Sequence, residues 1–260
     1  MKKFELTEET KKVHGITLHR IKAIASFGNV QKGDLGGLVE GEENLSQSGD
    51  AWVSGDAWVS GNAWVSGDAW VSGDAWVSGN AWVSGDACVY GDAWVSGNAC
   101  VYGYARVSGD ARVSGIAQVS GDARVTGNAR VSGDAWVSGN ARVYDDAQVY
   151  GNARVSGDAQ VSGNACVYGD AQVSGDARVS GNARVSGNAR VSGDEDYIVF
   201  KNWWSSGRYF TWTRSNDMWC VGCFYGTGKE LVEKAYRDSE KSGREYQRIV
   251  DYVEEIKKDK

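Results

Sequence analysis

Apolar and polar positions alternate through the middle of this chain in one six-residue unit. The unit has the order Gly, Asp or Asn, Ala, a variable residue, Val, and Ser or Tyr. It runs from Gly49 to Gly193, and its alanine recurs from Ala51 to Ala189 in 24 copies without an insertion. Within each copy the alternation has a period of two, which is typical of a β-strand with Ala and Val on one face. A fixed internal period of this kind indicates a repeat architecture.

Each unit predicts a four-residue strand followed by a sharp corner. Gly55 accepts a positive φ freely and Asp56 tolerates it well, so both fit a tight corner. One such strand cannot bury its Ala/Val face alone and needs copies stacked on it. Over residues 50–98 the corner residues follow the order Asp, Asp, Asn every 18 residues. Three units therefore predict one turn of a three-sided coil, and the whole repeat predicts about eight coils.

The unit resembles the hexapeptide repeat of left-handed β-helix proteins. In residues 53–58, Val-Ser-Gly-Asp-Ala-Trp, an aliphatic residue is followed four positions later by a small one, as in that family. The resemblance implies a left-handed parallel β-helix over residues 49–194. The general preference for right-handed crossovers favours the opposite hand, so the left hand rests on the resemblance.

The two flanks have different patterns. Residues 1–48 predict an N-terminal cap with strands at 4–6 and 16–21, and residues 33–39 look like a unit whose frame decays. Residues 195–260 predict a small α+β domain that either caps the rod or binds separately. Its expected elements are strands at 197–200, 208–213 and 218–224, a turn at 215–217, and two helices with capping boxes at Thr227/Glu230 and Ser242/Glu245.

Tryptophan fills most of the variable positions in the early units. The 18-residue period stacks Trp52 under Trp70, Trp58 under Trp76 and Trp94, and Trp64 under Trp82. Rings at this spacing stack for roughly 0.5–1.5 kcal/mol per pair. Three interpretations stay open: the columns stiffen the rod, a cap or second subunit covers them, or they bind sugars or bases. An apolar surface of this kind is typical of an interface, so these seven tryptophans are the candidate interface residues.

Arginine takes over the variable position in the later units. Arg106, Arg124 and Arg142 form one expected column, and Arg112 lies under Arg130. Either the nearby corner Asp residues offset these charges, or the guanidinium groups bind phosphate or carboxylate. Tyr104 and Ile116 replace the usual corner residue, and Tyr102 replaces a serine. Because a departure from a strict repeat is a place to look for a site, the candidate ligand-binding residues are Tyr102, Tyr104, Arg106, Arg112, Arg124, Arg130 and Arg142.

Composition narrows the function classes. A net charge of −6 argues against a general nucleic-acid partner. No apolar run is long enough to span a membrane, the N-terminus lacks a signal-peptide core, and five cysteines at irregular spacings suit a reducing cytoplasm. Cys220 and Cys223 form a C-x-x-C in a strand pattern without the second pair that a zinc site needs, so we expect structural thiols, no metal and no cofactor.

Enzymes of the left-handed β-helix class are mostly acyltransferases, and the resemblance implies a catalytic His near the coils. The two histidines here, His14 and His19, both lie in the N-terminal flank, and no loop interrupts the repeat. Residues 33–40 with 44–46, and residues 208–213 with 221–228, resemble hexapeptide-repeat proteins of phages and prophages in Gram-positive bacteria.

We therefore expect a non-enzymatic cytoplasmic binding protein of phage or prophage type. It would sequester a host factor or a nucleotide signal and so inhibit host defence. A self-associating scaffold, a trimer by family resemblance, is the first alternative, and an acyltransferase-like enzyme is the second.

Overall fold

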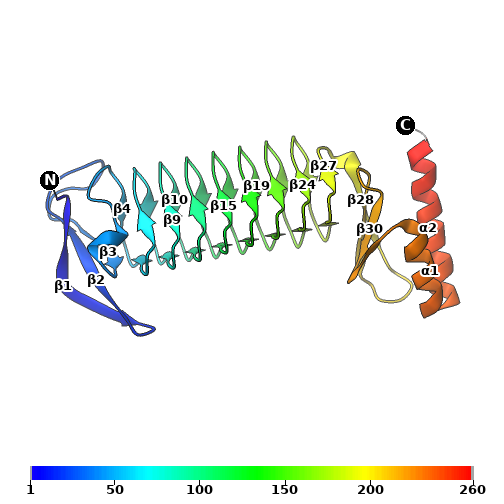
Figure 1. Ribbon diagram of the computed structural model, residues 1–260, viewed down its shortest axis with the longest axis horizontal. Helices are drawn as coiled ribbons and strands as arrows, with labels where there is room; N and C mark the ends of the chain where they lie inside the picture. Colours follow the sequence, from blue (N-terminus) through cyan, green and yellow to red (C-terminus); the bar gives the residue numbers. More distant parts are fainter. Residues whose placement is uncertain (1, 259–260) are drawn as a thin grey trace.

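The computed structural model describes residues 2–258. The repeat forms a long rod, with a β-hairpin at its N-terminal end and two helices at its C-terminal end (Figure 1). Consecutive strands lie on three different sheets, and each strand pairs in parallel with the strand 18 residues away, as in Val53 with Val71. The predicted three-sided β-solenoid is confirmed.

The three sheets run along the length of the rod. Sheet I contains β1 (Phe4–Val13), β2 (Ile16–Ala23), β3 (Leu35–Val39), β5 (Trp58–Val59), β8 (Trp76–Val77), β11 (Trp94–Val95), β14 (Arg112–Val113), β17 (Arg130–Val131), β20 (Gln148–Val149), β23 (Cys166–Val167) and β26 (Arg184–Val185). Sheet II contains β4 (Trp52–Val53), β7 (Trp70–Val71), β10 (Cys88–Val89), β13 (Arg106–Val107), β16 (Arg124–Val125), β19 (Arg142–Val143), β22 (Gln160–Val161) and β25 (Arg178–Val179). Sheet III contains β6 (Trp64–Val65), β9 (Trp82–Val83), β12 (Cys100–Val101), β15 (Gln118–Val119), β18 (Trp136–Val137), β21 (Arg154–Val155), β24 (Gln172–Val173) and β27 (Arg190–Val191).

Each repeat strand has two residues rather than the four that the pattern predicts. The flanking residues belong to the corner: Ala57 N donates to Ser54 O at 3.4 Å, which closes a four-residue turn around Gly55 and Asp56. Gly55 has φ +66, whereas Asp56 is not among the residues with positive φ. The corner is therefore of the type that needs glycine only at its first central position, and the expectation of a positive φ at Asp or Asn is wrong.

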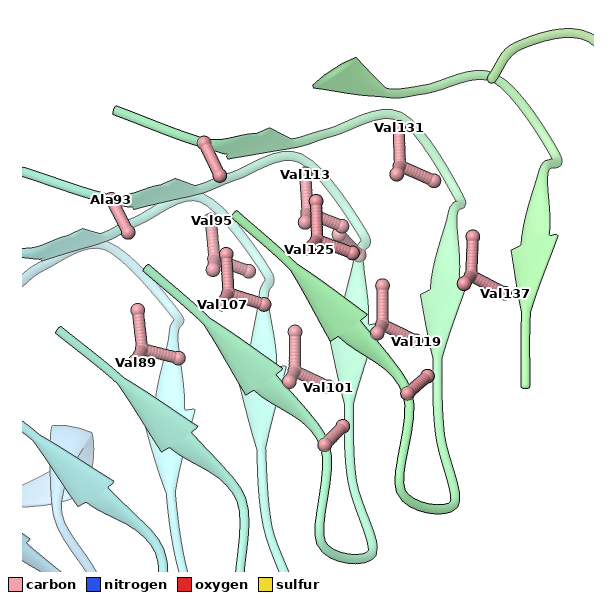
Figure 2. Close-up of a cluster of buried hydrophobic side chains, with 14 of the residues drawn as sticks. Val89, Ala93, Val95, Val101, Val107, Val113, Val119, Val125, Val131 and Val137 are labelled. Atoms are coloured by element: carbon pink, nitrogen blue, oxygen red, sulfur yellow. The ribbon is translucent and has the colours of Figure 1, made fainter. Parts of the chain in front are cut away.

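The rod interior consists of alanine and valine. Both residues of every unit are at most 1 % exposed, and the valines of successive coils point into the interior (Figure 2). Each fully buried valine contributes roughly 1.5–3 kcal/mol. Alanine and valine fill every coil, so all the coils have the same core composition.

One corner glycine is replaced, a departure that the sequence analysis does not single out. Asp145 occupies that position with φ +57, and its Oδ2 accepts a hydrogen bond from Gly163 N at 3.2 Å. Asp is among the residues with a Cβ that tolerate this region best.

The N-terminal flank adds one irregular turn and closes that end of the rod. Leu38 and Val39 of β3 pair in parallel with Trp58 and Val59, which confirms the decaying unit. The Lys3 ammonium and the Asn44 amide donate to carbonyls of the first regular coil, at Ala51 (2.7 Å) and Ala63 (2.9 Å). The hairpin of β1 and β2 also includes the polar residues 7–12 within β1.

The C-terminal flank closes the opposite end. A short 3₁₀ helix (Asp194–Asp196) leads into a four-stranded antiparallel sheet, β28 (Tyr197–Lys201), β29 (Tyr209–Thr213), β30 (Met218–Val221) and β31 (Phe224–Gly226), and then into α1 (Gly228–Asp238) and α2 (Glu240–Lys258). The predicted third strand is in fact a hairpin, since Val221 pairs with Phe224 around Gly222 and Cys223. These elements surround a second core that includes Phe210, Trp212, Trp219 and Val253.

One predicted helix cap is confirmed and the other is wrong. Thr227 Oγ1 accepts from Glu230 N, as a capping box requires. Helix α2 already begins at Glu240, so Ser242 lies inside it, and Ser239 Oγ accepts from Ser242 N at 3.1 Å instead. Among residues 2–258, no helix is long and apolar enough to cross a membrane.

The C-terminal strands and turns accept from the last coil of the rod. The backbone N–H groups of Arg178, Arg184 and Arg190 would otherwise face an absent coil. They donate to Asp194 Oδ1 (3.0 Å), Thr211 Oγ1 (2.9 Å) and Ser215 Oγ (2.6 Å), respectively, one on each sheet. The C-terminal segment therefore caps the last coil of the rod, which leaves a separate binding role open.

Candidate functional site

The predicted tryptophan columns are confirmed in register, but the three columns have different surroundings. Trp52 on sheet II is 2 % exposed and lies under Phe27 of the N-terminal cap, with ring centroids 5.5 Å apart. On sheet I, the hairpin covers the column in part: Lys11 Nζ lies 5.3 Å from the Trp58 ring, and His14 stacks on Trp76 at 5.7 Å. The N-terminal flank thus covers part of two columns.

The column on sheet III is open. Trp64 and Trp82 are 43 % and 47 % exposed and stack at 5.6 Å with an interplanar angle of 16°. The indole N–H of Trp82 donates to Ser66 Oγ of the preceding coil at 3.2 Å. Trp70 and Trp94 of the other sheets make the same bond to the preceding coil. Where a serine lies one coil before a tryptophan, it therefore fixes the tilt of that ring, and the stacked pair on sheet III presents a flat apolar surface.

The three arginines of sheet II form the predicted column. Arg106 pairs in register with Arg124, and Arg124 with Arg142; all three side chains are exposed. None of them forms an ion pair within the part of the chain that the structure describes. The corner Asp residues therefore do not offset these charges through direct contact.

Arg112 and Arg130 lie on sheet I, not beside the other three. They pair with each other in register, and the Arg112 guanidinium lies 5.5 Å from the centre of the Trp94 ring. Since sheets I and II face different directions, one small ligand cannot contact both arginine columns. The five predicted arginines thus form two groups, and the seven predicted ligand-binding residues are not one site.

The tyrosines predicted to join the site lie around the corner between sheets III and II. Tyr102 OH donates to Gln118 Oε1 at 3.4 Å on sheet III, and Tyr104 is 62 % exposed at the corner. Ile116, 55 % exposed, lies at the corner between sheets I and III. The departures of this coil therefore lie at two separate corners, one at each edge of sheet III, and do not converge.

A hollow of about 400 Å³ lies beside two arginines of sheet II. It is lined by Arg124, Thr126, Gly127, Arg142, Tyr144, Asp145 and Gln160. Three of these residues depart from the unit: Thr126 and Tyr144 replace the usual serine, and Asp145 replaces the corner glycine. Tyr144 OH donates to Gln160 Oε1 at 3.4 Å, which fixes the edge of the hollow.

The ligand-binding residues predicted from the sequence include Arg124 and Arg142 but not the other residues that shape this hollow. A signal was present, because Asp145 is the one position between Gly49 and Gly193 at which the corner glycine is replaced. Within residues 2–258, no cluster of His, Cys, Asp and Glu has the arrangement of a metal site. The hollow can therefore offer a ligand two guanidinium groups, two hydroxyls and a carboxylate.

The histidines of the acyltransferase alternative belong to the N-terminal hairpin. His14 lies at its tip, where φ is +48, and its ring stacks on Trp76. His19 lies within β2. This contact indicates that His14 packs over the tryptophan column of sheet I.

Comparison with known proteins supports the repeat architecture. A family model described as the YdcK beta-solenoid repeat matches residues 117–133, 147–163, 159–175, 171–185 and 183–194. No curated protein matches the chain. The matched segments all lie between residues 117 and 194, where arginine and glutamine fill many of the variable positions. Together with the fold, the match identifies the chain as a β-solenoid repeat protein.

Proposed function

We propose that this chain is a non-enzymatic cytoplasmic binding protein whose rod presents an anion-binding face on sheet II. The ligand is a phosphate-bearing molecule, such as a nucleotide signal, or an acidic surface of a host protein. The resemblance of residues 33–40 with 44–46, and of residues 208–213 with 221–228, to phage and prophage hexapeptide-repeat proteins supports a role in countering host defence.

The alignment of Arg106, Arg124 and Arg142 carries the proposal. Parallel strands place successive residues of a column roughly 4.8 Å apart, and like charges at that distance repel by on the order of 1 kcal/mol in water. No carboxylate pairs with these groups among the described residues. A phosphate that receives hydrogen bonds from two guanidinium groups removes this repulsion and gains charge-assisted bonds.

Native mass spectrometry of the protein as purified from cells tests the proposal first. A bound small anion, or a co-purified acidic protein, should leave on denaturation. The double variant Arg124→Ala/Arg142→Ala should lose that mass, whereas Arg112→Ala/Arg130→Ala, which removes the same charge from sheet I, should keep it. Equal retention by both double variants would exclude sheet II as the site.

Self-association is the second candidate, and the exposed pair Trp64 and Trp82 favours it. Stacked rings exposed on one flat face are typical of a surface that a partner covers, and a trimer would bury three copies of it. Trp64→Ser/Trp82→Ser should then give a monomer that keeps the circular dichroism of the rod. The matched variant Trp58→Ser/Trp76→Ser, on the face that the hairpin partly covers, should keep the mass of the assembly. A monomeric wild-type protein would exclude this candidate.

A further inference from the structure

A groove of about 740 Å³ lies between the last coils of sheet I and the C-terminal cap. The rod contributes Gln148, Asn164, Cys166, Asn182 and Arg184, and the cap contributes Arg208, Tyr209, Gly222 and Cys223. On the cap side, the groove is formed by the start of β29 and by the tip of the hairpin of β30 and β31. Grooves of this size between two units are frequent ligand sites.

Two guanidinium groups converge at the tip of this hairpin. Arg184 Nη1 donates to Gly222 O at 2.7 Å, and a Cβ added at Gly222 would lie 3.4 Å from Arg208 Nη1. Arg184 is held by the bond to Gly222 and keeps further N–H donors, while the Arg208 side chain is exposed. Both cations therefore lie within reach of one ligand group.

The rest of the lining is neutral. It contains no carboxylate, and neither Arg184 nor Arg208 forms an ion pair with any residue between 2 and 258. Gln148, Asn164 and Asn182 add amide donors from the rod. Burial raises the pKa of the Cys166 thiol, against the opposing effect of Arg184, so this sulfur adds no negative charge. In a chain with a net charge of −6, this groove is a local concentration of positive charge.

We propose that this groove binds a small phosphate-bearing anion, held by Arg184 and Arg208 and by the amides of Asn164 and Asn182. The site is separate from the arginine column of sheet II and goes beyond the function proposed above. Paired guanidinium groups match the oxygen atoms of a phosphate, and the amides supply donors that a chloride-sized ion would leave unused.

The cysteines provide a direct test with an internal reference. Cys223 is exposed and Cys166 half-buried in the groove, whereas Cys88 and Cys100 lie on sheets II and III. The full-length protein is treated with iodoacetamide, with and without millimolar inorganic pyrophosphate at matched ionic strength, and the alkylation rate of each cysteine is followed by mass spectrometry. Pyrophosphate should slow the alkylation of Cys223 several-fold and leave Cys88 and Cys100 unchanged.

Variants separate this site from a general charge effect. Arg208→Ala should raise the pyrophosphate concentration for half-protection by about tenfold, the effect of one lost hydrogen bond to a charged group. Asn164→Asp should also weaken the protection of Cys223, because it places a carboxylate in the groove. This variant keeps both guanidinium groups. Arg190→Ala makes the same charge change on sheet III, so pyrophosphate should protect Cys223 in this variant as it does in the wild type.

Three outcomes would overturn the proposal: unchanged alkylation of Cys223 at all pyrophosphate concentrations, equal slowing of all the cysteines, or protection by citrate but not by pyrophosphate. Arg124→Ala/Arg142→Ala leaves the groove intact, so pyrophosphate should still protect Cys223 in this double variant. Failure of the groove proposal is therefore distinguishable from failure of the sheet II proposal.

Discussion

At the scale of single residues, the corner glycines set the geometry of the rod. Almost all of them have φ between +59 and +72, and most lie directly against the corner of the next coil. A Cβ on Gly91 would approach Gly109 N to 3.0 Å, whereas a Cβ on Gly181 would meet nothing within 4 Å. Most corners therefore need glycine for two independent reasons, backbone conformation and close packing between coils.

We predict that Gly181→Ala lowers the free energy of unfolding by about 1–2 kcal/mol, the cost of a Cβ at positive φ. Gly91→Ala should lower it further, because the same strain is joined by contact with the backbone of Gly109. Urea unfolding followed by circular dichroism measures both variants. Equal destabilisation would mean that packing between coils adds nothing to the requirement for glycine.

The Lys3 ammonium gives the N-terminal end a pH dependence. Burial lowers the pKa of Lys3 from 10.5 to about 8, against the opposing attraction of Asp50 and Asp68. Between these two values the unfolded chain keeps a proton that the folded protein has released, so this group makes stability rise with pH across that window. The contribution is unfavourable below pH 8 and disappears as the pH rises towards 10.5.

We predict that Lys3→Met removes this slope. From pH 8 to 10.5, the melting temperature of the wild type should rise relative to that of Lys3→Met. Lys2→Met, which removes an exposed lysine paired with Glu42, is the control and should follow the wild-type curve. Parallel pH curves for the wild type and Lys3→Met would contradict the assignment.

At the scale of the elements, the two end coils carry backbone groups that a solenoid leaves without a partner. Every interior strand donates to the next coil, so the last coil has free N–H groups and the first has free carbonyls. The N-terminal flank supplies donors such as Lys3 and Asn44, and the C-terminal flank supplies acceptors such as Thr211 and Ser215. An open edge of this kind invites pairing with another chain, and side chains close it at both ends.

We predict that Thr211→Val frays the last coil. The variant keeps the shape of a fully buried side chain but leaves Arg184 N without its acceptor, which costs about 1–3 kcal/mol. Hydrogen exchange should show faster exchange at the Arg184 amide. Thr213→Val, whose lost hydroxyl bonds to Asn216 within the cap, should leave that amide protected. Unchanged exchange in Thr211→Val would mean that the cap is held by other contacts.

At the scale of the whole molecule, the rod could be predicted from sequence and its surroundings could not. The 18-residue recurrence of Asp, Asp, Asn is enough to assign every variable residue to one of three sheets, so the columns of Trp64 and Arg124 were predictable. Which column is covered depends on where the hairpin tip at His14 lies, and no local pattern encodes this. The groove at Arg208 likewise depends on how the cap docks.

We predict that whole coils can be removed from the rod. Deletion of residues 69–86 removes 18 residues and keeps every column in register, so the protein should fold and shorten by about 4.8 Å, measured by small-angle X-ray scattering. Deletion of residues 69–71 shifts corners onto strands and turns apolar residues outward, so it should lower the melting temperature sharply. Comparable losses in both variants would mean that the coils are not interchangeable.

The uniform core has a consequence for heredity. A gene that encodes nearly identical 18-residue segments is itself repetitive, and slippage during replication adds or removes copies of such a repeat. A change by a multiple of 54 nucleotides alters the distance between the two capped ends and disturbs neither of them. The spacing between whatever the two ends contact is therefore a trait that can vary between related genes without any new packing solution.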